Sequence, residues 1–193
     1  MKTKIRVTFL AGIIFVSLTS CDAVVFETPV PEDSKPLAII PEIFWDTYDF
    51  SGATNNISTL EITSAYMRAD DQVWYISDSM EVKKLGQDLV VNLKFRDKPL
   101  MGRHWTALVI SPPKSGMLSV HYIGSGLRTQ DVEQGVPPPI AANFGARMVS
   151  TDKTDPVVYV LRADAEKLRE ILADDRITIT VAGRKIDAKK IAR

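Results

Sequence analysis

The stretch that most constrains the fold runs from residue 88 to residue 96, where apolar and polar side chains alternate. The two sets are Leu89, Val91, Leu93 and Phe95 on one side, and Asn92, Lys94 and Arg96 on the other. A period of two residues is typical of a β-strand, whose successive side chains point to opposite faces of a sheet. The pattern therefore predicts a strand over 88–96 with one buried face and one face in water.

Shorter apolar runs recur along the chain at intervals of roughly ten residues, and turn-forming residues separate them. Two of these runs, 104–111 and 117–123, flank the segment 112–116, which has the Pro-Gly-containing composition of a hairpin loop. Strands at this spacing favour an antiparallel meander over βαβ units. We therefore expect a mainly β domain of the α+β class, built on a curled sheet or a small barrel.

One helix is expected near the carboxyl end, at about 164–173. Asp164 can cap it, and the apolar side chains at helical spacing are Ala165, Leu168, Ile171 and Leu172. A final strand should follow over 176–181, where isoleucine and valine alternate with threonine. A meander followed by one helix resembles lipocalin-like barrels, and this likeness implies a fold but no site residues.

The amino terminus has the layout of an export signal. The basic residues Lys2, Lys4 and Arg6 precede an uncharged apolar run, Val7–Leu18, and small polar residues then lead to the single cysteine, Cys21. A membrane-spanning helix needs about 20 apolar residues, so this run is too short for a retained anchor.

The four residues Leu18-Thr19-Ser20-Cys21 resemble the lipobox of bacterial lipoproteins. The resemblance implies cleavage before Cys21, a diacylglyceryl thioether on its sulfur and acylation of its amino group by a fatty acid such as palmitate. The mature chain would then be a lipid-anchored membrane protein of the bacterial cell envelope, with its domain outside the cytoplasm. An ordinary secreted protein, cleaved near Ser20, is the alternative.

Asp22 occupies the position where lipoproteins carry a sorting residue. In enterobacterial lipoproteins an aspartate there resembles the signal for retention at the inner membrane. In other bacterial groups, acidic residues after the cysteine accompany export to the cell surface. The sequence therefore leaves the inner and the outer membrane open.

Three parts of the chain are expected: a signal peptide (1–20), a lipidated proline-rich tether (21–41) and a single globular domain (42–193). The prolines of the tether are Pro29, Pro31, Pro36 and Pro41. Proline at this density favours extended backbone, so the tether should act as a semi-rigid spacer. The alternative is that Val24, Val25 and Phe26 pack on the domain as an edge segment.

A long segment, 124–156, separates the two halves of the expected sheet and contains four glycines and several prolines. Connections of this length are uncommon in compact domains and often carry function. We expect either a lid or binding surface, or an ordered crossover that covers one end of the sheet.

Composition excludes several functional classes. The whole chain carries 24 basic and 24 acidic residues, and the signal peptide contains three of the basic ones, so the mature chain is slightly acidic. This balance does not suggest nucleic acid, whose protein partners carry clustered positive charge. The chain ends in a basic tail that either contacts anionic lipid or is solvated: Arg184, Lys185, Lys189, Lys190 and Arg193. With Cys21 joined to lipid, no thiol remains for disulfides, thiol catalysis or cysteine-bound metal.

No motif for catalysis is present: the sequence lacks HExxH, GxSxG and a phosphate-binding loop. His104 and His121 lie in neighbouring expected strands and could share a metal with Asp131, or each could be a half-buried sheet residue. A serine hydrolase could pair one of these histidines with a nearby hydroxyl. The candidate serines are Ser111, Ser115 and Ser119. We expect no metal, no cofactor and no enzyme.

Aromatic residues on the expected strands either belong to the core or line a cavity for a ligand. Trp74, Trp105 and Tyr122 are the candidate ligand-binding residues. The favoured hypothesis is a non-catalytic lipoprotein with an envelope protein as partner, serving interaction or scaffolding. A carrier of a small apolar ligand or lipid is the first alternative, and an envelope hydrolase is the second.

Overall fold

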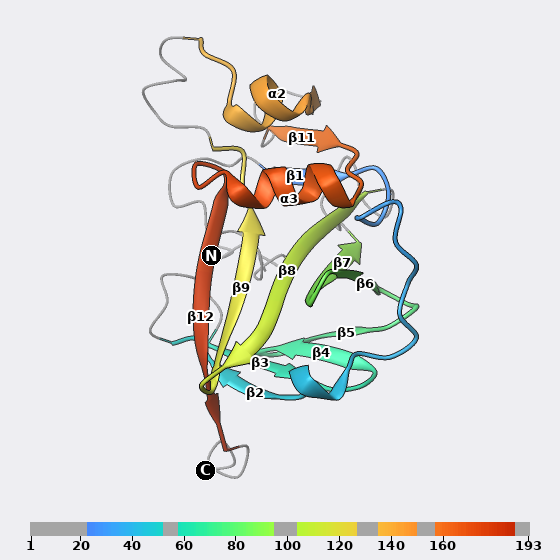
Figure 1. Ribbon diagram of the computed structural model, residues 1–193, viewed down its shortest axis with the longest axis vertical. Helices are drawn as coiled ribbons and strands as arrows, with labels where there is room; N and C mark the ends of the chain where they lie inside the picture. The colour runs from blue at the N-terminus through green and yellow to red at the C-terminus, as the bar shows by residue number, and fades with distance from the viewer. Residues whose placement is uncertain (1–22, 52–57, 95–103, 127–134, 150–156, 188–193) are drawn as a thin grey trace, which may run out of the picture.

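A computed structural model describes residues 23–51, 58–94, 104–126, 135–149 and 157–187. In these residues twelve strands form one mixed, mostly antiparallel sheet, accompanied by two α-helices and one 3₁₀ helix. The sheet curls but does not close into a barrel (Figure 1). The expectation of a mainly β fold with a curled sheet is confirmed.

The chain alternates short strands with few helices. The strands are β1 (Ala23–Phe26), β2 (Asp46–Asp49), β3 (Thr59–Ile62), β4 (Tyr66–Ala69), β5 (Gln72–Tyr75), β6 (Met80–Leu85), β7 (Asp88–Lys94), β8 (Trp105–Lys114), β9 (Met117–Ile123), β10 (Arg147–Val149), β11 (Val158–Leu161) and β12 (Thr178–Ile186). The helices are η1 (Glu42–Phe44), α2 (Pro139–Phe144) and α3 (Ala165–Ala173).

Two antiparallel meanders, β2–β5 and β6–β9, make up most of the sheet, and β12 joins them. Its residues 178–184 pair with β9, and its residues 184–186 pair with β2. The sheet can curl because this one strand continues from the first meander to the second (Figure 1). A large core of aliphatic and aromatic side chains fills the concave side.

The glycine of β12 explains why the final strand is longer than predicted. The sequence favoured an end near residue 181, but the pairing continues through Gly183 to Ile186. A Cβ atom at residue 183 would overlap the ring of Phe50, so only glycine lets the ring pack against the strand. Gly183 here serves close packing and not a turn.

Strand β7 confirms the predicted wet face at Lys94, which is exposed, but not at Asn92, and residues 95–96 lie outside the described part of the chain. Val90 and Asn92 are fully buried, as are Leu89 and Val91 on the other face. The side of Val90 is covered by a second core, to which β1, β11, α2 and α3 contribute. Because elements distant in sequence cover this side, both faces of β7 are shielded from water at residues 89–93.

Helix α3 confirms the predicted helix. The Asp164 carboxylate accepts the backbone N–H of Lys167 at 2.9 Å, which is the expected amino-terminal cap. Leu168 and Ile171 are its buried residues, and they face the second core. The expected order of helix and final strand is therefore also present.

The prediction of a tether over 21–41 is wrong for the described residues. Strand β1 lies inside the sheet, parallel to β11 and beside β8, and Val25 and Phe26 are fully buried. The folded domain therefore begins at or before Ala23 and not at residue 42. The sequence suggested a spacer because proline density is a local property, whereas the strands that cover β1 come from later in the chain.

The long segment 124–156 contains ordered elements. Helix α2 packs beside α3 and β11, and β10 adds an antiparallel strand to β11. Ile140 of α2 is fully buried in the second core. The described part of this segment therefore resembles the ordered crossover that was the alternative to a lid, and 127–134 and 150–156 lie outside the described residues.

Candidate functional site

The two residues expected to be lipidated and to direct sorting, Cys21 and Asp22, lie outside the described residues. The first described residue is Ala23, only two positions after Cys21. It already belongs to the sheet, since its N–H donates to the Val157 carbonyl at 2.9 Å. A group attached to Cys21 would thus be joined almost directly to the fold.

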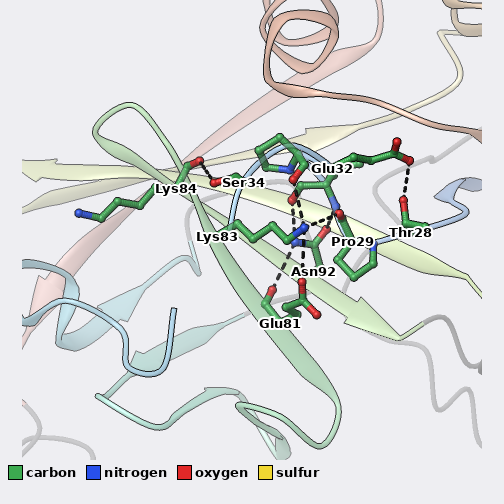
Figure 2. A network of polar contacts seen from close by, with 10 residues as sticks. Thr28, Pro29, Glu32, Ser34, Glu81, Lys83, Lys84 and Asn92 are labelled. Atoms are coloured by element: carbon green, nitrogen blue, oxygen red, sulfur yellow. Dashed lines mark hydrogen bonds and ion pairs between the residues drawn. The ribbon is translucent and has the colours of Figure 1, made fainter. Parts of the chain in front are cut away.

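The chain after β1 is held by a buried polar network, here called the clasp: Pro29, Val30, Pro31, Lys83 and Asn92. Figure 2 shows that the side chains of Lys83 and Asn92 point from β6 and β7 into the segment that contains the prolines. The Asn92 side chain accepts the N–H of Val30 at 2.8 Å and donates to the Val30 carbonyl at 2.8 Å. It thus takes the place of a neighbouring strand for one residue of the segment.

Lys83 supplies the charge of the clasp. Its Nζ donates to the carbonyls of Pro29 and Pro31, at 2.9 and 3.1 Å, and lies 3.4 Å from a carboxylate oxygen of Glu81. Only 5% of Lys83 is exposed. A buried ammonium needs hydrogen-bond acceptors, and the carbonyls of Pro29 and Pro31 supply two of them.

A second group of contacts fastens the end of the clasp to the chain before α3. The carboxylate of Glu32 accepts from the Arg162 guanidinium at 2.8 Å and from the Thr28 hydroxyl at 2.5 Å. The hydrogen bond from Arg162 is the main reason that the pKa of Glu32 lies below its usual value. Residues 28–32 therefore touch two separate parts of the domain.

The three candidate ligand-binding aromatics do not meet at one site. Trp74 and Tyr122 are buried members of the core on the concave side of the sheet. Trp105 instead packs against the second core, with the Lys94 ammonium 5.6 Å from the centre of its ring. The sequence could not distinguish these locations, because all three lie on strands.

A different set of apolar residues is exposed: Ile39, Ile43, Trp45 and Tyr75, here called the distal patch. Their exposed fractions are 61%, 61%, 39% and 52%. Three of them come from the chain around η1, which is fixed to the turn between β3 and β4. The N–H of Ile40 donates to the Ser64 carbonyl in that turn at 2.9 Å, and the Trp45 indole donates to the Ile40 carbonyl at 2.7 Å.

Tyr75 reaches the same turn from β5. It pairs directly with Tyr66, with ring centroids 5.8 Å apart, and the next N–H, of Ile76, donates to the Ala65 carbonyl at 3.0 Å. The Tyr66 hydroxyl donates to Glu61 at 3.0 Å, and Arg68 forms an ion pair with the same carboxylate. The patch is therefore aromatic and aliphatic with a charged margin.

No protein-family model, curated protein or solved structure matches the chain.

One of the candidate serine and histidine pairs for a hydrolase is in contact in the structure. The Ser111 hydroxyl lies 3.1 Å from Nε2 of His121, and Nδ1 of His121 lies 2.8 Å from the Thr180 hydroxyl. Burial lowers the pKa of His121 and the charge of Asp88 opposes this, so the shift favours the neutral imidazole. A neutral imidazole can accept a proton from serine, but a hydroxyl stands here where hydrolases place a carboxylate.

The structure does not bring together the two histidines of the candidate metal site, His104 and His121. His121 of β9 pairs with Val109 of β8. His104 precedes Val109 by five residues, so along the strand it lies roughly 16 Å from the position opposite His121. Asp131 is outside the described residues. Among the residues that are described, no three histidine, cysteine or acidic side chains are grouped closely enough to bind a metal ion.

The described helices also bear on membrane attachment. None of them combines the length and the hydrophobicity that crossing a bilayer requires.

Sequence reasoning missed the clasp and most of the distal patch. Asn92 carried no local signal, because a polar residue at an alternate position of a strand normally faces water. Ile39 lies in an irregular segment and Ile43 in the three-residue helix η1, and both stretches are too short for a periodicity that distinguishes an exposed residue from a buried one.

Proposed function

We propose that the protein is a lipid-anchored lipoprotein of the bacterial cell envelope whose domain binds another protein without catalysing a reaction. The signal and lipobox pattern that ends at Cys21 supports the anchor. The distal patch is the single observation that carries the binding role. Isolated exposed apolar side chains are common, but these four belong to two segments that both hydrogen-bond to the turn between β3 and β4, and we take them as one interaction surface.

The composition of the distal patch favours a protein as its partner. Tryptophan and tyrosine are enriched at the energetic centres of protein interfaces, and a polar margin is usual there. Trp45 and Tyr75 would be such anchors, with Glu61 and Arg68 at the margin.

The location of the distal patch favours a protein over a lipid surface. In Figure 1, β1, β11 and α2 occupy the upper part of the molecule, and η1 with β2–β5 occupies the lower part. If lipid holds the chain at Cys21, the end of the domain near β1 is the end close to the membrane. The distal patch then points away from the bilayer, where another protein can reach it.

A site-specific photo-crosslinker in living cells tests this proposal. The crosslinker would replace Ile39 or Ile43, and the control would carry it at Met148, which is as exposed as Ile43 at 61%. We expect both patch positions to capture one and the same protein and the control to capture none. Trp45→Glu in addition should abolish the product.

Three other results would decide against the proposal. Capture at the control position alone, capture unaffected by Trp45→Glu, or no capture at either patch position would each contradict a partner at the distal patch. A product with twice the mass of the chain would identify the partner as a second copy.

The anchor has its own test. Wild-type protein should be found with the membrane fraction, and Cys21→Ser should leave the signal uncleaved and prevent lipid attachment. Metabolic labelling with a clickable fatty acid should mark the wild type only. If Cys21→Ser were still cleaved and labelled, lipid would be attached elsewhere.

One contact favours a second candidate, an envelope hydrolase. The hydrogen bond between Ser111 and His121 has the geometry of a nucleophile and its base. A fluorophosphonate probe should label such a serine in the wild type and not in Ser111→Ala. Absence of labelling across the range from pH 7 to pH 9 would exclude this candidate.

A further inference from the structure

We infer that the edge strand β10 lies on the surface of the membrane that holds Cys21, with Met148 and Arg147 among the lipid headgroups. This inference rests on the proposed lipid anchor and adds the orientation of the domain. It commits to a phospholipid surface as the partner of β10.

The first argument is the short length of chain between the lipid and the fold. Only Asp22 lies between Cys21 and Ala23, and the two Cα–Cα steps from Cys21 to Ala23 span at most about 7 Å when extended. Register places Val158 beside Ala23 and Val149 beside Val158. Two strand spacings of about 4.8 Å then put Val149 roughly 10 Å from Ala23. The end of β10 is therefore within about 17 Å of the lipidated residue.

The second argument is that the domain cannot swing away on this connection. Val25 and Phe26 are fully buried, and the clasp holds the following residues through Lys83 and Asn92. Separating β1 from the sheet would expose the second core, which contains Phe26, and a small cluster in which Val25 packs against β11. Because β1 is part of the sheet, a lipid on Cys21 holds the β1 end of the sheet near the membrane.

The third argument is the chemistry of β10. Within the described residues β10 pairs with β11 alone, so it is an edge strand. Met148 is 61% exposed, and the side chain of Arg147 is 71% exposed. An exposed apolar side chain beside a cation suits the boundary between headgroups and acyl chains. Glu27, whose carboxylate lies 3.6 Å from Arg147, partly balances that charge.

A depth measurement on the full-length lipidated protein tests this orientation. The protein would be placed in vesicles of phosphatidylethanolamine and phosphatidylglycerol that contain a lipid with a nitroxide near the headgroup. Since Cys21 is the single cysteine and its thiol would carry lipid, Met148→Cys adds one free site for an environment-sensitive fluorophore. Ile43→Cys is the control, because Ile43 and Met148 are equally exposed.

We expect the fluorophore at residue 148 to lose most of its emission to the nitroxide lipid and the fluorophore at residue 43 to lose little. Arg147→Cys provides a second position on β10 and should behave like residue 148. Equal quenching at 43 and 148, or stronger quenching at 43, would overturn the orientation.

Flotation of the same vesicles separates this inference from the proposed anchor. If the protein floats with the vesicles and quenching is equal at the two ends, the anchor stands and the orientation is wrong. If the protein does not float, the anchor fails and the orientation fails with it.

Discussion

The substitution Asn92→Ala tests whether the clasp holds the amino-terminal segment in the fold. Asn92 is fully buried, and its side chain makes two hydrogen bonds of 2.8 Å with the backbone of Val30. Alanine lacks the amide group of Asn92, so the buried N–H and the buried carbonyl of Val30 each lose a hydrogen-bond partner. Each such group costs about 1–3 kcal/mol when it is not rehydrated.

The expected loss of stability follows from these two groups. Together they give a range of about 2–6 kcal/mol, and water entering the space left by the amide lowers the cost, so we expect about 3 kcal/mol. For a protein of this size, each kcal/mol corresponds to roughly 2–4 °C in Tm. Asn92→Ala should therefore lower Tm by about 6–12 °C.

Two measurements check this prediction. Urea unfolding followed by circular dichroism gives the free energy of unfolding, and hydrogen exchange reports the protection of the Val30 amide. Asn143→Ala is the matched control, because Asn143 is exposed on α2 and its hydrogen bond to Asp174 can be replaced by water, so it should stay within about 1 kcal/mol of the wild type. A change this small for Asn92→Ala, with the Val30 amide still protected, would refute the reasoning.

Three further predictions concern other parts of the fold. Lys83→Met should lower the free energy of unfolding in urea by about 2 kcal/mol or more, because the carbonyls of Pro29 and Pro31 lose their hydrogen-bond donor. Lys84→Met, on an exposed neighbour, should change little, and equal effects would contradict the role of the clasp. Gly183→Ala should cost about 1–3 kcal/mol in the same assay, since its methyl group would overlap the ring of Phe50, and an unchanged midpoint would show that the ring can move. NMR titration should give His121 a pKa below 6.5, because burial disfavours the imidazolium. The fold should then lose stability as the pH falls from 6.5 through that lowered pKa, and His121→Gln should remove this part of the pH dependence.

The clasp also changes what the anchor would mean for the protein. A proline-rich tether would let the domain reach far from the membrane, whereas a strand that begins two residues after Cys21 keeps it close. We therefore expect a partner at the distal patch to come within one domain length of the same membrane. The crosslinking and quenching experiments address the two ends of this arrangement separately.

The sequence alone predicted the elements whose signals are local. The alternation over 88–96 indicated β7, and the apolar spacing after Asp164 indicated α3 with its cap. Both signals arise from the period of a single strand or helix, so they need no knowledge of the rest of the chain. The mainly β class followed from the recurrence of such strands.

Tertiary structure decided which of these elements are covered and by what. Residues 23–26 resembled part of a spacer until their partners were known, and those partners are β8 and β11, which begin at Trp105 and Val158. Asn92 appeared to face water because the residue it binds, Val30, is 62 positions away. The contact of Ser111 with His121 and the gathering of the distal patch likewise depend on how strands are paired. Periodicity tells which side chains share a face, but only the paired sheet determines what that face meets.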